Sequence, residues 1–174
     1  TKYPLTLFYC KCCSNIQISE TVDKDLLFKN YFWVTGTSEL VQKYANIFLK
    51  KIINISKSNY KDLIIEVGSN DGTFLNSLIK KKYLNVLGVD PAKNLTNEAN
   101  KNNINTINNF WDLKTSIRIK KKYGKAKVIF ARNVIPHVSD LHSVMEGIKN
   151  ILDNYGYGFI EFHSAHTILN KLQY

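Results

Sequence analysis

The sequence predicts an α/β domain in which a mostly parallel sheet carries helices on both faces, with a small piece of strands and helices ahead of it. Two observations predict this fold class. Residues 63–67 form a largely apolar run, which is typical of a strand buried on both faces. From residue 61 onward such runs alternate with helical segments, as in parallel sheets. The 174 residues suffice for one such domain and an appendage, and we expect about five strands.

The first 60 residues predict two further parts. Residues 1–20 form a small β-rich piece, because apolar side chains alternate over residues 5–9 and 16–18 on either side of a cysteine-containing turn. Residues 21–60 are mainly helical, with a short helix over residues 22–29 and an aromatic stretch that ends at Gly36. Thr37 or Ser38 then caps a helix that runs to about Ile55, because its apolar side chains are three or four residues apart.

Residues 61–174 form the α/β part, whose strands and helices follow one another in regular order. A turn over residues 68–72 leads from the first strand into a helix, and Pro91 stops the second strand. The predicted strands span residues 63–67, 85–90, 104–107, 126–131 and 157–162. The predicted helices span residues 74–79, 94–101, a Lys-rich stretch after Trp111, and residues 138–152.

The net charge of +10 raises the question of nucleic acid as a partner. Apart from Arg118 and Arg132, all 24 basic residues are Lys, whereas proteins that read bases or grip phosphates bidentately favour Arg. We therefore expect a solvated basic surface and no nucleic-acid partner. No apolar run approaches the roughly 20 residues that cross a bilayer, and the first residues lack a signal-peptide pattern. We expect a cytoplasmic protein that does not enter the membrane.

The turn after the first strand carries the pattern of a cofactor loop. A dinucleotide fingerprint, Gly-x-Gly-x-x-Gly, fails here, because its second and third glycines would fall on Asn70 and Thr73. The remaining pattern is an acidic residue followed by x-Gly-x-x-x-Gly, which resembles the first motif of Rossmann-like class I methyltransferases that use S-adenosylmethionine. The resemblance implies that this turn cradles the methionine part of the cofactor, with Glu66, Gly68, Ser69, Asn70 and Gly72 as its residues.

Further candidates follow the other strands, because ligands bind at the carboxyl ends of parallel strands. Asp90 ends the second strand, where a carboxylate can accept hydrogen bonds from both ribose hydroxyls; the alternative is a helix cap. Phe110 or Trp111 covers the adenine face, or belongs to the core. Ala131 and Asn133 stand where a carbonyl and an amide meet the sulfonium end.

His137 lies beyond the fourth strand and next to Pro136, which predicts a place on the rim of the site. A histidine there can take or give a proton near neutral pH, and the alternative is a solvent-facing or capping residue. The three cysteines, Cys10, Cys12 and Cys13, fall within one short stretch. This clustering favours a metal site or reduced thiols over a disulfide framework.

Five segments, in order along the chain, resemble the sugar C-methyltransferases of deoxysugar biosynthesis, which methylate carbon 3 of nucleotide-linked 4-keto-deoxyhexoses. The segments are Tyr3–Leu5 with Cys10, Cys13 and Gln17–Ile18; Tyr31–Ser38; Glu66–Leu75; Gly88–Asn94; and Asn133–Val138. The resemblance implies that Pro91 and Asn94 belong to the second cofactor motif. It also implies that Tyr31 or Trp33 contacts the sugar or its nucleotide, and that His137 stabilises an enolate oxygen.

The resemblance also predicts what would lie beyond both ends of the chain. Residues 1–20 look like the second half of a zinc-binding domain, in which Cys10 and Cys13 supply two of the four ligands of tetrahedral zinc. The other cysteine pair would precede Thr1, so we expect zinc only in a longer protein. A catalytic base and the last two strands would follow Tyr174. We therefore expect a truncated sheet with an open edge, which a homodimer would cover.

Two other functions stay open. One keeps the cofactor and methylates an oxygen or nitrogen of another small molecule. The other is a basic nucleic-acid-binding protein with a vestigial α/β domain, which predicts tight, salt-dependent binding. C-methylation of a nucleotide sugar, which the resemblance implies, accounts for more of the motifs than either alternative.

Overall fold

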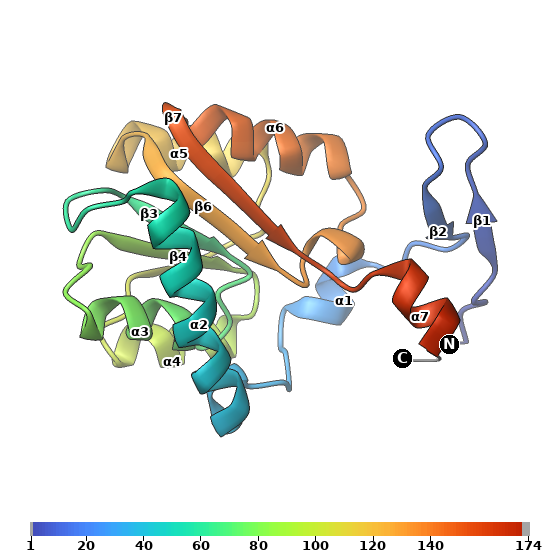
Figure 1. The fold of residues 1–174 in the computed structure, drawn as a ribbon. Helices are drawn as coiled ribbons and strands as arrows, with labels where there is room; N and C mark the ends of the chain where they lie inside the picture. Colours follow the sequence, from blue (N-terminus) through green and yellow to red (C-terminus); the bar gives the residue numbers. More distant parts are fainter. Residues whose placement is uncertain (1, 172–174) are drawn as a thin grey trace.

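The computed structural model describes residues 2–171 and centres on a five-stranded sheet (Figure 1). All neighbouring strands are parallel, in the order β5-β4-β3-β6-β7. The strands are β3 (Ile64–Val67), β4 (Val86–Asp90), β5 (Thr106–Asn108), β6 (Ala126–Arg132) and β7 (Leu152–Glu161). This is a Rossmann-like α/β fold, which confirms the predicted class, and its sheet is wholly parallel.

Helices cover both faces of the sheet, because alternate side chains of each strand enter different hydrophobic clusters. Ile64 and Val128 face one cluster, with side chains from α2 (Glu39–Ser56), α3 (Thr73–Lys80) and α4 (Lys93–Lys101). Ile65 and Ile129 face the other, with side chains from α5 (Leu113–Tyr123) and α6 (Leu141–Ile151). Figure 1 shows these two helical layers on opposite sides of the strands.

The order of the strands creates a switch point between β3 and β6. From β3 the chain moves outward through β4 to β5, and it then crosses back to β6 and β7 on the other side. The loops that follow β3 and β6 therefore leave the sheet in opposite directions. A crevice at this point of an open parallel sheet is the usual place for a ligand.

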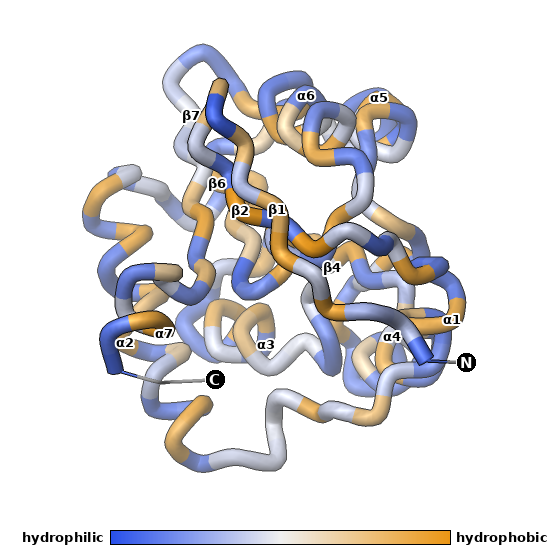
Figure 2. The backbone as a smooth tube through the Cα atoms, turned by 90° about the vertical axis from the view of Figure 1, so that its right-hand side faces the viewer, coloured by the Kyte–Doolittle hydropathy of each residue, from blue (hydrophilic) through white to orange (hydrophobic). Residues whose placement is uncertain are grey.

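The N-terminal residues form a hairpin at the side of the α/β domain. Strands β1 (Leu7–Tyr9) and β2 (Ile16–Ile18) are antiparallel, and all residues from 2 to 20 are exposed. Figure 2 looks onto this hairpin and shows that apolar positions of β1 lie at the front, away from the core. The chain continues through α1 (Lys24–Phe28) and the 3-10 helix η1 (Thr35–Thr37) into α2.

The predicted elements of the α/β part are present, with two notable differences. β7 begins at Leu152, directly after α6, whereas the sequence predicted a start at residue 157. A short helix, α7 (Ala165–Lys171), was not predicted, because none of its residues is buried and its sequence has no apolar stripe. A second 3-10 helix, η2 (Ile135–His137), stands where Pro136 predicted a break.

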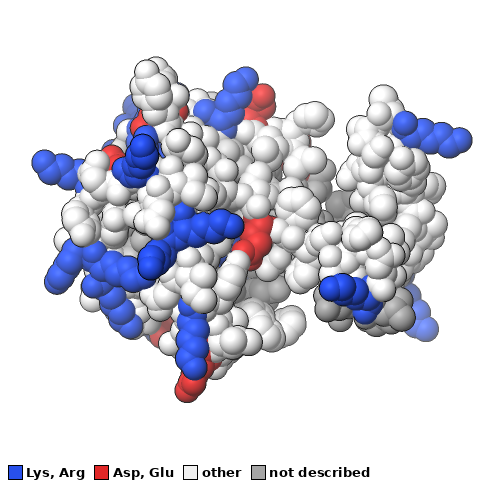
Figure 3. Space-filling view, viewed as in Figure 1, with Lys and Arg blue, Asp and Glu red and all other residues white. Residues whose placement is uncertain are grey.

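Among the charged side chains visible in Figure 3, basic ones cover more of the surface than acidic ones and lie mainly over the α/β domain. Among residues 2–171 no helix is long and apolar enough to cross a membrane. These residues include four ion pairs, two of them on single helices and two that share Arg132. Most of the positive charge therefore faces solvent.

Candidate cofactor site

A cavity of about 570 Å³ lies at the carboxyl ends of the central strands, at the switch point. This volume falls within the range of small-molecule and cofactor pockets. Its walls come from distant parts of the chain: residues 24–41, the loops after β3 and β4, residues 110–112, residues 132–144 and His163. The sheet topology brings these segments together.

The loop after β3 is a tight turn whose backbone conformations explain its glycines. Gly68, Asn70 and Gly72 have φ values of 68°, 54° and 79°, in the left-handed region that glycine and asparagine tolerate best. The N–H of Gly68 donates to the carbonyl of Val89 at 2.8 Å. A Cβ atom on Gly68 would stand 2.3 Å from Cγ2 of Val134, so this position accepts no side chain without a shift of β6's following loop.

Asp90 closes the cavity opposite this loop. Its side chain accepts hydrogen bonds from the N–H groups of Asn70 and Ala92, each at 2.8 Å. Burial raises the pKa of Asp90, and these two backbone hydrogen bonds oppose the rise. Each carboxylate oxygen can accept a second hydrogen bond. Asp90 therefore braces the loop and the start of α4, and it keeps acceptor capacity for a ligand's hydroxyl groups.

Glu66 lies elsewhere, on the face of the sheet that α2 and α3 cover. Its side chain is 1% exposed and stands 3.7 Å from the guanidinium of Arg132, and one of its oxygens, Oε2, is buried without a hydrogen bond among the described residues. Burial raises the pKa of Glu66 to about 8, although Arg132 lowers it. Glu66 does not line the cavity; it supports the strand that carries the loop.

An aromatic wall bounds the cavity on the side of the N-terminal segment. Tyr31 and Trp33 both line the cavity, and the ring centroid of Phe28 is 5.8 Å from that of Tyr31. Phe28 also contacts His137, with ring centroids 6.2 Å apart. The predicted acceptor-side residues, Tyr31, Trp33 and His137, are thus brought to one rim.

Phe110 is a further aromatic residue that lines the cavity. The Nζ atom of Lys24 lies 4.5 Å from the centre of the Phe110 ring, which is a cation–π distance. Trp111 borders the cavity but is 7% exposed, and its indole N–H donates to the carbonyl of Val144 at 3.2 Å. Trp111 is therefore a core residue, and of the two aromatic candidates Phe110 is the one free to meet a planar ligand.

The structure gathers most of the predicted site residues, but not all of them. Those that line the cavity are Tyr31, Trp33, Gly68, Asn70, Asp90, Pro91, Phe110, Asn133 and His137. Those that do not are Glu66, Ser69, Gly72, Asn94 and Ala131. Ser69 and Ala131 are buried beneath the loops, and Gly72 is buried where a Cβ would stand 2.8 Å from Ile104. Asn94 instead bonds to the backbone of Tyr31, at 2.8 and 3.1 Å.

The predicted metal ligands stand apart from this site. Cys10, Cys12 and Cys13 are exposed free thiols in the turn between β1 and β2. Within residues 2–171, no three His, Cys, Asp or Glu side chains come together as a metal site. Hydrogen bonds from the backbone N–H groups of Cys13 and Cys12 lower the pKa of the Cys10 thiol.

Sequence reasoning missed several residues that line the cavity. They include Lys24, Phe28, Arg132 and Ser143. For Arg132 a signal was present, since an Arg at the end of a buried strand needs a carboxylate partner, and Glu66 and Glu161 are the acids at the ends of neighbouring strands. For Lys24 and Phe28 no local pattern distinguishes a cavity wall from an ordinary helix.

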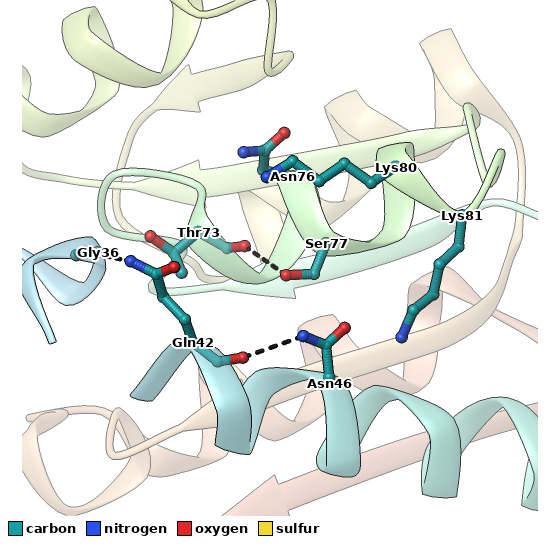
Figure 4. Close-up of a pocket in the computed structure, with 8 residues that line it drawn as sticks. All are labelled: Gly36, Gln42, Asn46, Thr73, Asn76, Ser77, Lys80 and Lys81. Carbon is teal, nitrogen blue, oxygen red and sulfur yellow. Dashed lines mark hydrogen bonds between the residues drawn. The ribbon is translucent and has the colours of Figure 1, made fainter. Parts of the chain in front are cut away.

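A second hollow, of about 380 Å³, lies between α2 and α3 on the other side of η1 (Figure 4). Gly36 lines it, whereas the preceding residue, Thr35, lines the larger cavity. The other lining residues are all polar or basic: Gln42, Asn46, Thr73, Asn76, Ser77, Lys80 and Lys81. The chain at η1 is therefore the partition between the two hollows.

Comparisons with known proteins agree with this geometry. A family described as "Methyltransferase domain" matches residues 40–173. The C-methyltransferase NovU of Streptomyces niveus is 26% identical over 174 residues, which are all of this chain and 41% of that protein. The chain thus spans less than half the length of this relative.

Solved structures share the fold at low sequence identity. The plantazolicin methyltransferase BpumL, in complex with a desmethylPZN analog and SAH, has a TM-score of 0.61 at 18% identity, covering 78% of this chain and 52% of that one. The PH0226 protein of Pyrococcus horikoshii OT3 has a TM-score of 0.60 at 15% identity, covering 80% and 62%.

Proposed function

Because the chain belongs to the methyltransferase domain family, we propose that it binds S-adenosylmethionine and is part of an enzyme that methylates a carbon atom of a nucleotide-linked keto-deoxysugar. One observation carries the cofactor: Asp90 faces the glycine loop across the ends of β4 and β3, inside the cavity. The acceptor rests on the motifs of the sequence and on the relative NovU, whose name is that of a C-methyltransferase.

The residues of the cavity suit this cofactor. Gly68, which has no side chain, lines the cavity with its backbone, and Asp90 offers acceptors for the ribose hydroxyls. Phe110 offers an apolar face for the adenine once the ammonium group of Lys24, which lies over the Phe110 ring, moves aside. Asn133, with φ of 53° directly after β6, lines the same space. When bound, S-adenosylmethionine supplies an electrophilic methyl group.

C-methylation would take place at the acceptor side of the cavity. A 4-keto group acidifies the proton on carbon 3, and its removal by a base leaves the electron pair in an enolate. His137, on the rim, would donate a hydrogen bond to the enolate oxygen. Carbon 3 then forms a bond to the methyl carbon while the methyl–sulfur bond breaks and its electron pair stays on sulfur. Tyr31 and Trp33 would hold the sugar in line.

Calorimetric titration with S-adenosylhomocysteine tests the cofactor site. We expect binding by the unchanged chain and a loss of roughly 10- to 100-fold in affinity for Asp90→Ala, because hydrogen bonds to a charged group are lost. Glu98→Ala, which removes an exposed carboxylate from α4, is the matched control and should leave the affinity unchanged. A folded protein that shows no binding would contradict the proposed cofactor.

Titration of the S-adenosylhomocysteine complex with dTDP- and GDP-linked 4-keto-hexoses tests the acceptor. Binding of one of them, weakened by Trp33→Ala, is the expected result. If the chain binds S-adenosylhomocysteine but none of the nucleotide sugars, the result would favour an O- or N-methyltransferase with another acceptor. Tight, salt-dependent affinity for nucleic acid, with no affinity for either ligand, would favour the basic binding protein.

A further inference from the structure

The segment from Lys29 to Gly36 is tied to the α/β domain through every second residue. The N–H of Lys93 donates to the carbonyl of Lys29 at 2.9 Å. The amide of Asn94 binds both backbone groups of Tyr31, donating at 2.8 Å and accepting at 3.1 Å. We name residues 29–36 the strap.

The second half of the strap is held by the loop after β3. Nδ2 of Asn70 donates to the carbonyl of Trp33 at 2.9 Å, and Oδ1 of Asn70 accepts from the N–H of Thr35 at 2.9 Å. The next residue, Gly36, donates to Oδ2 of Asp71 at 2.9 Å. The strap therefore lies against the domain, and its partners are mostly side-chain amides and carboxylates.

The same alternation directs the strap's side chains. Tyr31, Trp33 and Thr35, whose backbone groups are held, line the cavity, whereas Phe32, between them, is 87% exposed. Holding the backbone at residues 31, 33 and 35 therefore also fixes which side chains of the strap face the cavity. Without these hydrogen bonds, Tyr31 and Trp33 would no longer be held in place as the acceptor-side wall of the cavity.

Close packing at Gly36 supports the same arrangement (Figure 4). Nε2 of Gln42 donates to the carbonyl of Gly36 at 2.7 Å. A Cβ atom at this position would stand 2.6 Å from Oδ2 of Asp71 and 2.7 Å from Oγ1 of Thr73. The backbone N–H and Oγ1 of Thr73 both donate hydrogen bonds to the carboxylate of Asp71. The two side chains therefore hold each other and cannot move aside freely.

We infer that Asn70 and Asn94 are positioning residues, whose amides hold the strap as the acceptor-side wall of the cavity. Both belong to the segments that would also carry the cofactor: Asn70 is in the glycine loop, and Asn94 lies in the first turn of α4, four residues after Asp90. Since this inference rests on the proposed function, it predicts that the cofactor and the wall stabilise each other, because coupling between two sites is reciprocal.

Limited trypsin digestion of the whole chain, followed by mass spectrometry, tests the anchor at Asn94. The bond after Lys29 lies in the strap, and its carbonyl is hydrogen-bonded, so cleavage there requires the strap to detach. The bond after Lys57, at the end of α2, is the internal reference. Asn94→Ala removes two hydrogen bonds and should speed cleavage after Lys29 roughly tenfold, with the reference unchanged.

Asn97→Ala is the matched control, since Asn97 is an exposed asparagine on the same helix and its side chain makes no hydrogen bond to residues 2–171. Gly36→Ala tests the other end of the strap and should give the same selective increase. Equal cleavage after Lys29 in Asn94→Ala and Asn97→Ala would overturn the inference. So would an increase of the same size after Lys57, because it would indicate general destabilisation.

The coupling is tested by adding saturating S-adenosylhomocysteine to the unchanged chain. We expect cleavage after Lys29 to slow several-fold while cleavage after Lys57 stays constant. If the ligand binds and cleavage after Lys29 does not change, the coupling is wrong. If the ligand does not bind, the proposed cofactor is wrong, and the digestion of the ligand-free variants still decides the role of Asn94.

Discussion

Arg132 connects a cluster of polar side chains that lies behind the loop after β3. Its guanidinium lies 3.3 Å from the centre of the Phe74 ring, 3.7 Å from Glu66 and 4.0 Å from Glu161. Tyr44 donates a hydrogen bond to Glu161, and burial, followed by this contact, raises the pKa of Tyr44 to about 12. Two carboxylates thus share one cation, and burial raises the pKa of the more buried of them, Glu66.

The pKa of Glu66 makes the stability of the domain depend on pH. In the folded chain it is raised from 4.5 to about 8, so between these values the folded state binds a proton that the unfolded state has released. The free energy of unfolding should therefore fall as pH rises through this window, by up to about 1.4 kcal/mol per pH unit from this group.

Denaturant unfolding of the unchanged chain and of Glu66→Gln between pH 5 and pH 8 measures this contribution. The variant should show a shallower decline, because glutamine does not titrate. Glu98→Gln, at an exposed position on α4, should follow the unchanged chain. Parallel profiles for the unchanged chain and Glu66→Gln would show that Glu66 is ionised throughout the window, held by Arg132.

At the scale of the elements, hydrophobic pattern predicted those strands and helices that enter the core. Where the pattern was weak, the bounds were wrong. Residues 153–156, Asp-Asn-Tyr-Gly, have the composition of a turn, and although β7 includes them they fall in the register shift between the pairs Ala126–Leu152 and Val128–Tyr157. The early pair at Leu152 extends the strand, whereas continuous pairing begins at Tyr157 as predicted; α7 escaped prediction because it buries nothing.

β7 is one of the two edge strands of the five-stranded sheet. Within residues 2–171 it pairs with β6 alone, and Tyr157 and Ile160 along it are 41% and 37% exposed. Unpaired strand edges invite association, and a lysine on an edge opposes it. We therefore expect the chain to self-associate with rising concentration, and Ile160→Lys to reduce this association.

Sedimentation velocity over a range of concentrations checks the prediction. Ile117→Lys is the matched control, since Ile117 is 52% exposed on α5, away from this edge. A chain that stays monomeric at all concentrations would contradict the prediction. An equal effect of both variants would point to added charge, and not to the strand edge, as the cause.

For the whole molecule, the sequence predicted where the site lies but not how its outer wall is held. Strand ends can be read from local pattern, and parallel strands bring their ends together, so Gly68 and Asp90 were placed correctly in one cavity. The strap was not predictable, because Asn94 and Tyr31 are 63 residues apart and one asparagine on a helix resembles another. The sequence motif predicted that Asn94 belongs to the cofactor site, whereas in the structure its side chain forms hydrogen bonds with the backbone of Tyr31.

The cavity's walls, drawn from almost the full length of the chain, have a consequence for the lifetime of the protein. A ligand bound there touches segments that are together only in the native state, so it adds to the stability of the whole fold by mass action. At a hundredfold excess over its dissociation constant, a single ligand contributes about 2.7 kcal/mol. The supply of ligand in the cell would then set how often the chain opens to proteases, and abundance would follow metabolism without any change in synthesis.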